Sequence, residues 1–388
     1  MAQQTTGGSN TALLTGPGAA NGAISTTADR RALYLKLFSG ELFKGFQHNT
    51  IARDLVMKRT LKNGKSLQFI YTGRTTAEYH TPGNSILGNS DSAPPVAEKT
   101  ITCDDLLISS AFVYELDETL AHYDLRGEIS KKIGYALAEK YDRKIFQAIT
   151  KAARKASPIT KTNYVEPGGT QVRVGTTTNA SDAYSATALV NAFYDAAAAL
   201  DEKGVSTEGR VGVLNPRQYY ELIQQVGENG LVNRDEQGTS RQKGNGIVEI
   251  AGIKIYKSMN IPFFGRYGTK FGTGSATNPG VTDPGNKGDF VEVEMVDETA
   301  GSGAVKTVNN YGNGTSDFEN SCGLIFGREA AGVVEAIGPQ VQVTSGDVSV
   351  IYQGDVILGR MALGADYLNP AAAVELFAGT ATKPAAFG

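Results

Sequence analysis

Apolar residues recur at helical spacing between residues 125 and 149, which is the longest regular pattern in the chain. They occupy nearly every fourth position: Leu125, Ile129, Ile133, Leu137, Tyr141, Ile145 and Ile149. Asp124 suits the N-cap and Glu128 the first turn, whereas Lys151, Arg154 and Lys155 place positive charge in the last turn, where it favours the helix dipole. The pattern predicts one helix over residues 124–156, about 48 Å long at 1.5 Å per residue.

Alternating residues predict strands before this helix, at 66–71, 100–104 and 111–115. The stretch between the first two is rich in Gly, Pro, Ser and Asn, which indicates a long two-stranded flap with an irregular tip. An isolated hairpin is marginally stable in water, so this flap is expected to rest on a second subunit. The alternative is a lid over an active site.

After the long helix, the pattern predicts a compact α+β domain. An Ala-rich helix over 185–203 is closed by Gly204, a strand over 210–214 precedes a helix with Pro216 in its first turn, and 247–255 forms a hairpin about Gly252. Strands are expected again at 333–337, 341–343, 348–352, 356–363 and 369–377. Residues 1–28 carry no charged side chain and are predicted to form an arm that orders only against a neighbour.

Composition narrows the class of protein. The 388 residues hold 37 Lys and Arg against 40 Asp and Glu, which argues against a nucleic-acid binder driven by bulk charge. No apolar stretch approaches the roughly 20 residues of a membrane span and no secretion signal is evident, so an intracellular product without a membrane partner is expected. Cys103 and Cys322 stand far apart in apolar surroundings, which favours two buried free thiols over a disulfide.

The motifs of enzymes and metal sites are missing from the sequence. It contains no phosphate-binding glycine loop, no HExxH, no CxxC and no GxSxG, and its three histidines are scattered at 48, 80 and 122. We therefore expect no catalytic, cofactor or metal site. The long helix carries nine Lys and Arg against four Asp and Glu. Its basic end (Lys151, Arg154 and Lys155) is either solvated or meets phosphates or an acidic assembly partner.

The order of parts, which is arm, flap, long helix, α+β lobe and returning strands, resembles the major capsid proteins of tailed bacteriophages with the Hong Kong 97-type α+β fold. The similarity is greatest to the short-tailed, autographivirus-like phages. Residues that resemble the flap of that group are Gly73, Arg74, Thr75, Tyr79, Pro82 and Gly83. Asp124, Arg126 and Glu128 are similar to the entry into the spine helix of that group, and Ile133, Tyr141, Lys151 and Arg154 are the further residues that we assign to this helix.

The resemblance implies a division of the chain into five parts. They are an N-terminal arm (1–56), an extended E-loop flap (57–108), a peripheral domain with the spine helix (109–185), an axial domain (186–330), and strands that return to the peripheral domain together with the C-terminus (331–388). Residues 157–185 and 265–318 are longer and richer in Gly than the family pattern predicts, so no loop position is transferred there.

The resemblance also implies a structural role in the virion, with assembly in the host cytoplasm. Such subunits form hexamers and pentamers that close into an icosahedral shell, with scaffolding and portal proteins as partners and double-stranded DNA inside, held by weak contacts. Two alternatives remain open. An encapsulin-type compartment would share the fold and enclose enzymes, and an enzyme with a mobile lid would be a small oligomer with catalytic residues near His80 or His122.

Overall fold

The computed structural model describes residues 51–73, 79–84, 94–103, 106–115, 125–161, 164–175, 180–224, 249–258, 260–261, 321–343, 353–378 and 383. They fall into two compact units. The first takes in residues 104–139 and 336–363, and the second residues 49–103, 140–335 and 364–388. Three elements continue from one unit into the other: α4 (Leu125–Arg154), β12 (Ala331–Val343) and β13 (Gly354–Tyr367).

The second unit is built on a six-stranded mixed sheet with the order β7-β14-β11-β8-β10-β9. Its strands are β7 (Thr170–Arg173), β8 (Val211–Leu214), β9 (Glu249–Ile250), β10 (Ile253–Lys257), β11 (Ser321–Phe326) and β14 (Ala373–Phe377). The pairs β10–β8 and β14–β7 are parallel, and β11 runs antiparallel to both of its neighbours. The central strands β8, β11 and β14 are buried at every position, as expected for strands covered on both faces.

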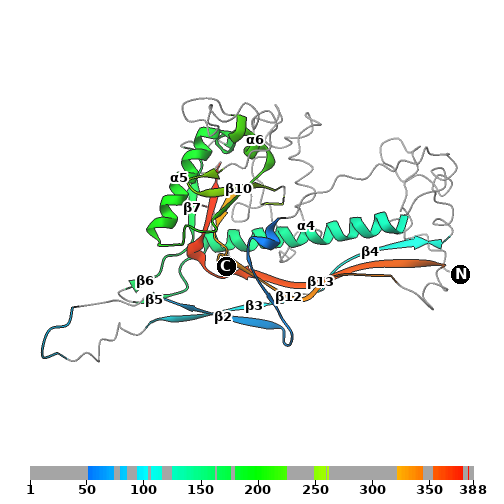
Figure 1. The fold of residues 1–388 in the computed structure, drawn as a ribbon, viewed down its shortest axis with the longest axis horizontal. Coiled ribbons are helices and arrows are strands. Elements are labelled where there is room, and N and C mark those ends of the chain that lie inside the picture. The colour runs from blue at the N-terminus through cyan, green and yellow to red at the C-terminus, as the bar shows by residue number, and fades with distance from the viewer. Residues whose placement is uncertain are drawn as a thin grey trace. The chain divides into compact units, whose positions relative to one another are not determined.

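Helices α5 (Ala186–Glu202) and α6 (Pro216–Gln224) and the short 3-10 helix η4 (Ala180–Tyr184) share a core with this sheet (Figure 1). Phe193 and Leu222 are fully buried there beside Val374 and Leu376 of β14. A Cβ at Gly212 would lie 2.8 Å from Phe193 Cε1, so only glycine allows α5 to approach β8 this closely.

Several local predictions for this unit are confirmed. Pro216 begins α6, Gly204 after α5 has a φ of +70°, and β9 and β10 form the expected antiparallel hairpin, with Ala251 and Gly252 at φ values of +52° and +74°. Positive φ at two consecutive turn residues is typical of a tight hairpin.

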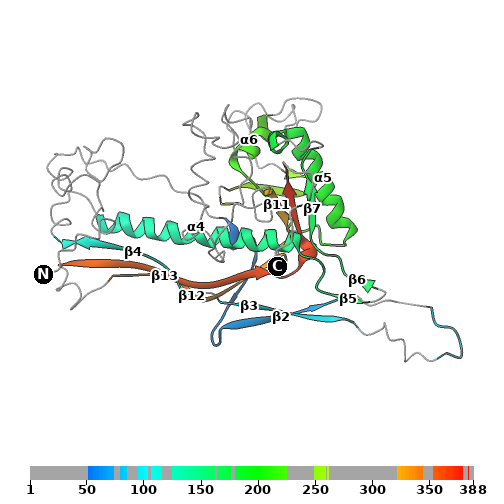
Figure 2. The same cartoon turned by 180° about the vertical axis from the view of Figure 1, so that it is seen from behind.

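In the first unit, the amino-terminal half of α4 packs on β4 (Leu107–Tyr114) and β13, which pair antiparallel from Leu107↔Met361 to Tyr114↔Gly354. A Cβ at Gly359 would lie 2.4 Å from Ile133 Cγ2 and 2.9 Å from Leu137 Cδ1, so the helix lies directly on the backbone of β13. Figure 2 shows the helix beside these strands from behind. The sheet order is β1-β12-β13-β4.

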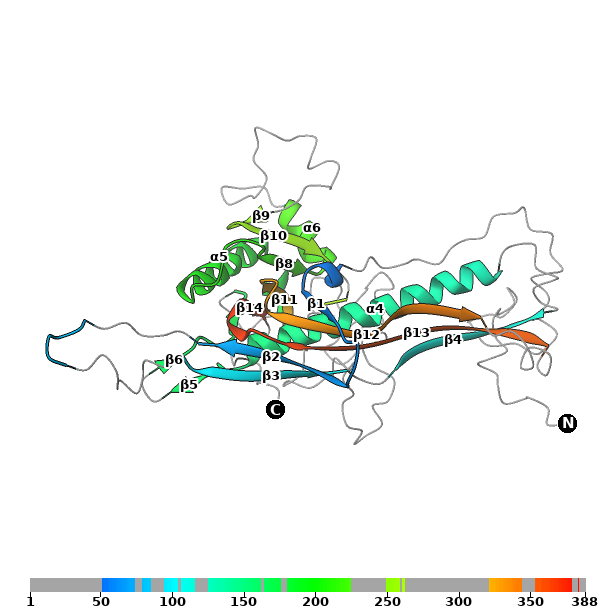
Figure 3. The same cartoon turned by 60° about the horizontal axis from the view of Figure 1, so that its bottom comes forward.

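The remaining elements precede β4 or connect the larger ones. They are η3 (Ala52–Asp54), β1 (Met57–Thr60), β2 (Ser66–Thr72), β3 (Val96–Thr102), β5 (Thr160–Lys161), β6 (Tyr164–Val165) and η6 (Pro370–Ala372). β2 and β3 pair antiparallel as a separate two-stranded sheet from Ser66↔Thr102 to Thr72↔Val96, and they form the flap (Figure 3). The predicted long helix is α4.

Two placements differ from the division expected from the sequence. Residues 57–60 were assigned to the flap, but they form β1, which pairs in parallel with β12 from Met57↔Gly332 to Thr60↔Glu335. Residues 369–377 were grouped with the returning strands and the C-terminus, whereas β14 joins the six-stranded sheet between β7 and β11 and not the sheet of β12 and β13. Residues 1–50 of the arm, the Gly-rich stretch 265–318 and the strand predicted at 348–352 lie outside the described residues.

Candidate assembly surfaces

The flap buries one face and exposes the other. Leu67, Phe69 and Tyr71 on the inner face are half-buried, and Ile101 opposite Leu67 is buried. On the outer face Ile70 is 74% exposed and Val96 is 62% exposed. The described part of the second unit therefore supports only the inner face, and two large apolar side chains are left in solvent on the other.

The inner face is fixed at β3 by Lys99. Its ammonium lies 2.7 Å from Asp366 Oδ2 and 3.7 Å from the centre of the Tyr367 ring. These contacts join the flap to the end of β13 through an ion pair and a cation–π interaction, each of modest strength because the groups are partly exposed.

Gly73 ends β2 at a crowded point. Its N–H donates to Pro95 O at 2.8 Å, and a Cβ on it would lie 2.7 Å from Pro95 Cγ and 3.1 Å from Glu166 Oε1. A larger residue at this position would therefore displace the Pro95 ring or its neighbours. Arg74 and Thr75, which the resemblance groups with Gly73, lie outside the described residues.

The other predicted flap residues form an exposed turn. Asn84 N–H donates to Thr81 O at 3.1 Å, and Gly83 has a φ of +98°. Pro82 followed by glycine at positive φ is the pattern of a type II turn. Tyr79, just before it, is fully exposed, so its aromatic ring does not pack on the part of the chain that the structure describes.

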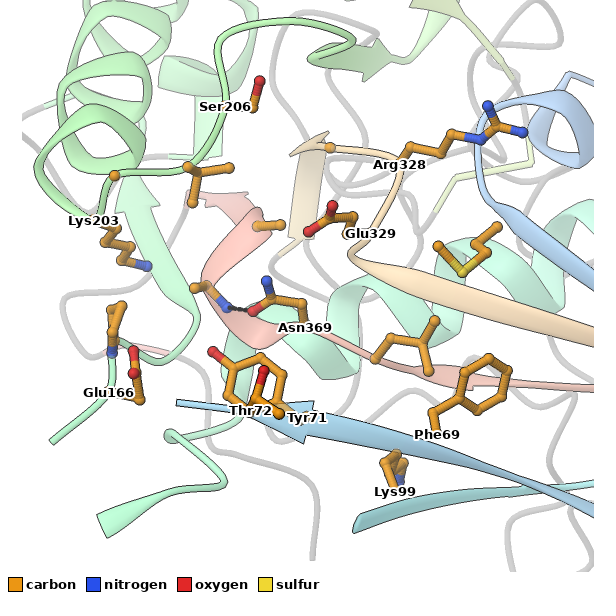
Figure 4. Close-up of a pocket in the computed structure, with 18 of the residues that line it drawn as sticks. Phe69, Tyr71, Thr72, Lys99, Glu166, Lys203, Ser206, Arg328, Glu329 and Asn369 are labelled. Carbon is orange, nitrogen blue, oxygen red and sulfur yellow. Dashed lines mark hydrogen bonds between the residues drawn. The ribbon is translucent and has the colours of Figure 1, made fainter. Parts of the chain in front are cut away.

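A cavity of about 700 Å³ lies between the flap strand β2 and loops of the same unit (Figure 4). Its lining mixes acidic and basic groups, among them Glu166, Lys203 and Glu329. Lys203 Nζ donates to Gly168 O at 2.5 Å and to Thr170 Oγ1, and burial lowers the pKa of Lys203 to about 8. The flap is therefore not packed along its whole inner face.

The carboxyl-terminal half of α4 binds distant parts of the chain through two adjacent residues. Asp142 accepts hydrogen bonds from the N–H groups of Ile51 and Ala52 at 2.8 and 3.2 Å. Tyr141 donates to Glu335 Oε1 at 2.8 Å, and Lys58 Nζ lies 2.7 Å from Glu335 Oε2. Burial and the neighbouring Glu335 raise the pKa of the Tyr141 hydroxyl, so it remains a donor. These contacts hold residues 51, 52 and 58 beside the carboxyl-terminal half of α4.

The last turn of α4 differs from the prediction of an outward basic end. The Arg154 guanidinium is fully buried and binds both carboxylate oxygens of Glu375, at 2.7 and 2.6 Å. Gln171 donates to the same carboxylate at 3.0 Å. Arg154 therefore holds the helix to β14 and cannot meet a phosphate. Lys151 is half-buried, and burial is the main reason that its pKa is lowered.

The other predicted spine residues have different surroundings. Glu128 is buried and Ile133 packs on Gly359. Asp124 and the side chain of Arg126 lie outside the described part of the chain.

Three further features bear on the class of protein: groups of metal-ligating side chains, helices able to cross a membrane, and the two thiols. No group of three or more His, Cys, Asp or Glu side chains could hold a metal ion there. None of the helices found there combines the length and the apolar character needed to cross a membrane. Cys103 and Cys322 are both free and buried, which confirms the prediction for the thiols.

Sequence reasoning missed Glu335, Glu375 and the clamp formed by Asp142. A signal existed for Glu375, because it is a lone acid inside the apolar run Ala373–Phe377, and a fully buried carboxylate requires a partner. No such signal marked Asp142, whose partners are main-chain groups about ninety residues away.

Comparisons with known proteins agree with this geometry. The family model Gp10A-like, described as major capsid protein, matches residues 68–377. The major capsid protein of Escherichia phage T7 is 26% identical over 361 residues, which cover 90% of this chain and 93% of the relative. The major capsid protein of Enterobacteria phage T3 is 34% identical over 127 residues, or 32% of this chain and 36% of that protein.

Solved structures extend the likeness to the fold. The capsid structure of Cyanophage P-SCSP1u matches with a TM-score of 0.67 and 30% identity over 93% of this chain and 97% of that one. The mature capsid of bacteriophage PhiM1 matches with a TM-score of 0.59 and 15% identity over 90% and 92%. These matches confirm the Hong Kong 97-type capsid fold. The chain belongs to the Gp10A-like family of phage major capsid proteins.

Proposed function

We propose that this major capsid protein assembles head to tail into hexamers and pentamers that close into an icosahedral shell around double-stranded DNA. The observation that carries the proposal is the flap. Its outer face leaves Ile70 and Val96 in solvent, and Tyr79 beyond it is fully exposed. Apolar side chains concentrated on a thin two-stranded element favour burial on another subunit.

In each ring, the flap of one copy lies on the next copy. A contact between two different surfaces of identical subunits is heterologous, and it closes into a ring when the rotation between copies allows. Shell assembly takes place in the host cytoplasm on a scaffolding protein, and a portal protein occupies one vertex. The balanced charge of the chain favours weak contacts with the packaged DNA.

A pair of double variants tests the role of the outer face. Ile70→Glu with Val96→Glu removes the two apolar side chains and adds two charges. Gln68→Glu with Thr100→Glu adds the same charges on the same face without loss of apolar surface. Each protein is expressed alone and with its scaffolding protein, and the products are viewed by negative-stain electron microscopy.

We expect closed shells from the wild type and from the Gln68/Thr100 variant, and few or none from the Ile70/Val96 variant. Equal shell yields from both variants would show that the apolar outer face of the flap is not part of the assembly contact. A monodisperse dimer or tetramer of the wild type under both conditions would contradict the shell itself.

A further inference from the structure

Strand β4 is the edge of its sheet. It pairs with β13 along its whole length, from Leu107↔Met361 to Tyr114↔Gly354, and among the described residues no strand pairs with its other side. Figures 1 and 2 both show β4 alongside β13. The eight residues LISSAFVY contain no charge and no proline, which are two of the devices that protect an edge from pairing. This edge is therefore competent to accept another strand.

One face of β4 is covered and the other is open. Ser109, opposite Gly359, lies on the face that Ile133 and Leu137 of α4 cover. Ile108, Ser110, Phe112 and Tyr114 alternate onto the outer face, where Ile108 is 57% exposed and Tyr114 is 37% exposed. Leu106, two residues before Ile108, is also exposed. The Phe112 and Tyr114 rings meet edge to face, with centroids 5.3 Å apart.

The residue order along this open face is self-complementary. When two copies of β4 run antiparallel with Ser110 opposite Ser110, Ile108 stands opposite Phe112 of the second copy and Leu106 opposite Tyr114. Pairs of an aromatic with a large aliphatic residue stabilise neighbouring strands, and hydroxyl groups facing each other can hydrogen-bond. Centred one residue away, on Ser109 or Ala111, the pairing places Ser110 opposite Ile108 or Phe112, so an apolar side chain loses its apolar partner.

We propose that β4 pairs with β4 of a second copy, antiparallel about Ser110, and joins two subunits by one continuous sheet. The inference rests on the proposed function, because a closed shell needs contacts between rings as well as within them. The contact is isologous, since each copy contributes the same surface. The heterologous flap contact and this isologous contact use separate parts of the chain.

Cysteine pairing in assembled particles tests both the contact and its register. Ser110→Cys places a thiol directly opposite its own copy, at a Cβ separation of about 4.5–5.5 Å that small adjustments bring within disulfide range. Ile108→Cys and Phe112→Cys are made singly and are also co-assembled as a mixture. The native thiols are buried, so the wild type serves as the background. Shells are oxidised, checked by electron microscopy and separated on non-reducing gels.

We expect dimer bands from the Ser110→Cys shells and from the mixed Ile108→Cys and Phe112→Cys shells, and monomer from the wild type and from each of the latter variants alone. Closed shells in which Ser110→Cys remains monomeric would overturn the pairing and leave the proposed function intact. This is also the result if residues 1–50 or another protein cover the edge. Dimers from Ile108→Cys alone would overturn the register. Absence of wild-type shells would instead overturn the proposed function, and with it the pairing between rings.

Discussion

The two halves of α4 carry a similar helical pattern but have very different surroundings. In the first half, buried Ile133 and Leu137 alternate with exposed Lys131, Lys132 and Tyr135. In the second half, every residue from Tyr141 to Thr150 is buried, and half of these ten residues are polar or charged. The first half is thus an amphipathic helix on one sheet. The second is a core helix whose polar groups bind distant segments, and changes in the two halves should have different costs.

The largest expected effect is at the end of the second half. Arg154→Ala leaves Glu375 charged, buried and without its main partner, and this should lower the free energy of unfolding by about 3–5 kcal/mol. Urea denaturation of the unassembled subunit measures the loss. Lys132→Ala in the first half should change it by less than about 0.5 kcal/mol.

The double variant with Met at both positions 154 and 375 separates charge from packing. Because it removes both charges and keeps apolar volume, it should recover most of the stability. If it is as unstable as Arg154→Ala, the loss comes from packing and not from the unpaired carboxylate.

The first half of α4 makes a close contact with Gly359 of β13, and a change at this glycine should be costly. Gly359→Ala should lower the free energy of unfolding by about 1–3 kcal/mol, because the added methyl overlaps Ile133 Cγ2. Adding Ile133→Ala removes that atom, so the double variant should lose less than the sum of the two single changes. Strict additivity in a double-mutant cycle would show that the helix is not held against β13 here.

A comparable loss should follow from opening the clamp on the end of the arm. Asp142→Ala leaves the N–H groups of Ile51 and Ala52 without their acceptor, at a cost of about 1–3 kcal/mol. Limited proteolysis should then cut near residue 51 faster than in the wild type. Asp142→Asn, which keeps one acceptor oxygen, should be intermediate, and an unchanged cleavage rate would contradict the clamp.

A pH-dependent effect is also expected in the second half. Burial lowers the pKa of Lys144 in the folded state to about 8, below its ordinary value of 10.5. Between these values the unfolded chain binds more protons, so stability due to Lys144 rises with pH, by at most about 1.4 kcal/mol per unit. The free energy of unfolding of the wild type, relative to that of Lys144→Met, should therefore rise from pH 8 to 10.

What the sequence could predict depends on the range of the interaction. The helix 125–154, the Pro216 start of α6 and the hairpin about Gly252 depend on neighbours within a few residues, so periodicity and turn chemistry were sufficient. Residues 369–377 have the composition of a strand, but which sheet they join depends on residues near 170 and 321, far away in the chain.

The candidate site divides in the same way. Pro82 followed by Gly83 predicts a turn from two adjacent residues alone. The exposure of Ile70 follows from the alternation of side chains along β2. The direction of Arg154 could not be inferred, because a basic residue in the last turn of a helix suits the dipole whether it faces solvent or a buried carboxylate. The position of Glu375 determines that the Arg154 side chain points into the core, and only the fold brings Glu375 beside Arg154.

The strand order of the six-stranded sheet has a consequence for synthesis on the ribosome. Among the strands that the structure describes, β7 pairs only with β14, and Thr170 pairs with Val374, which is translated about two hundred residues later. At about 5–20 residues per second, β7 waits roughly 10–40 s for its partner to emerge. During this interval β7 lacks the strand with which it pairs in the folded chain, so this part of the sheet can form only after nearly the whole chain has been translated.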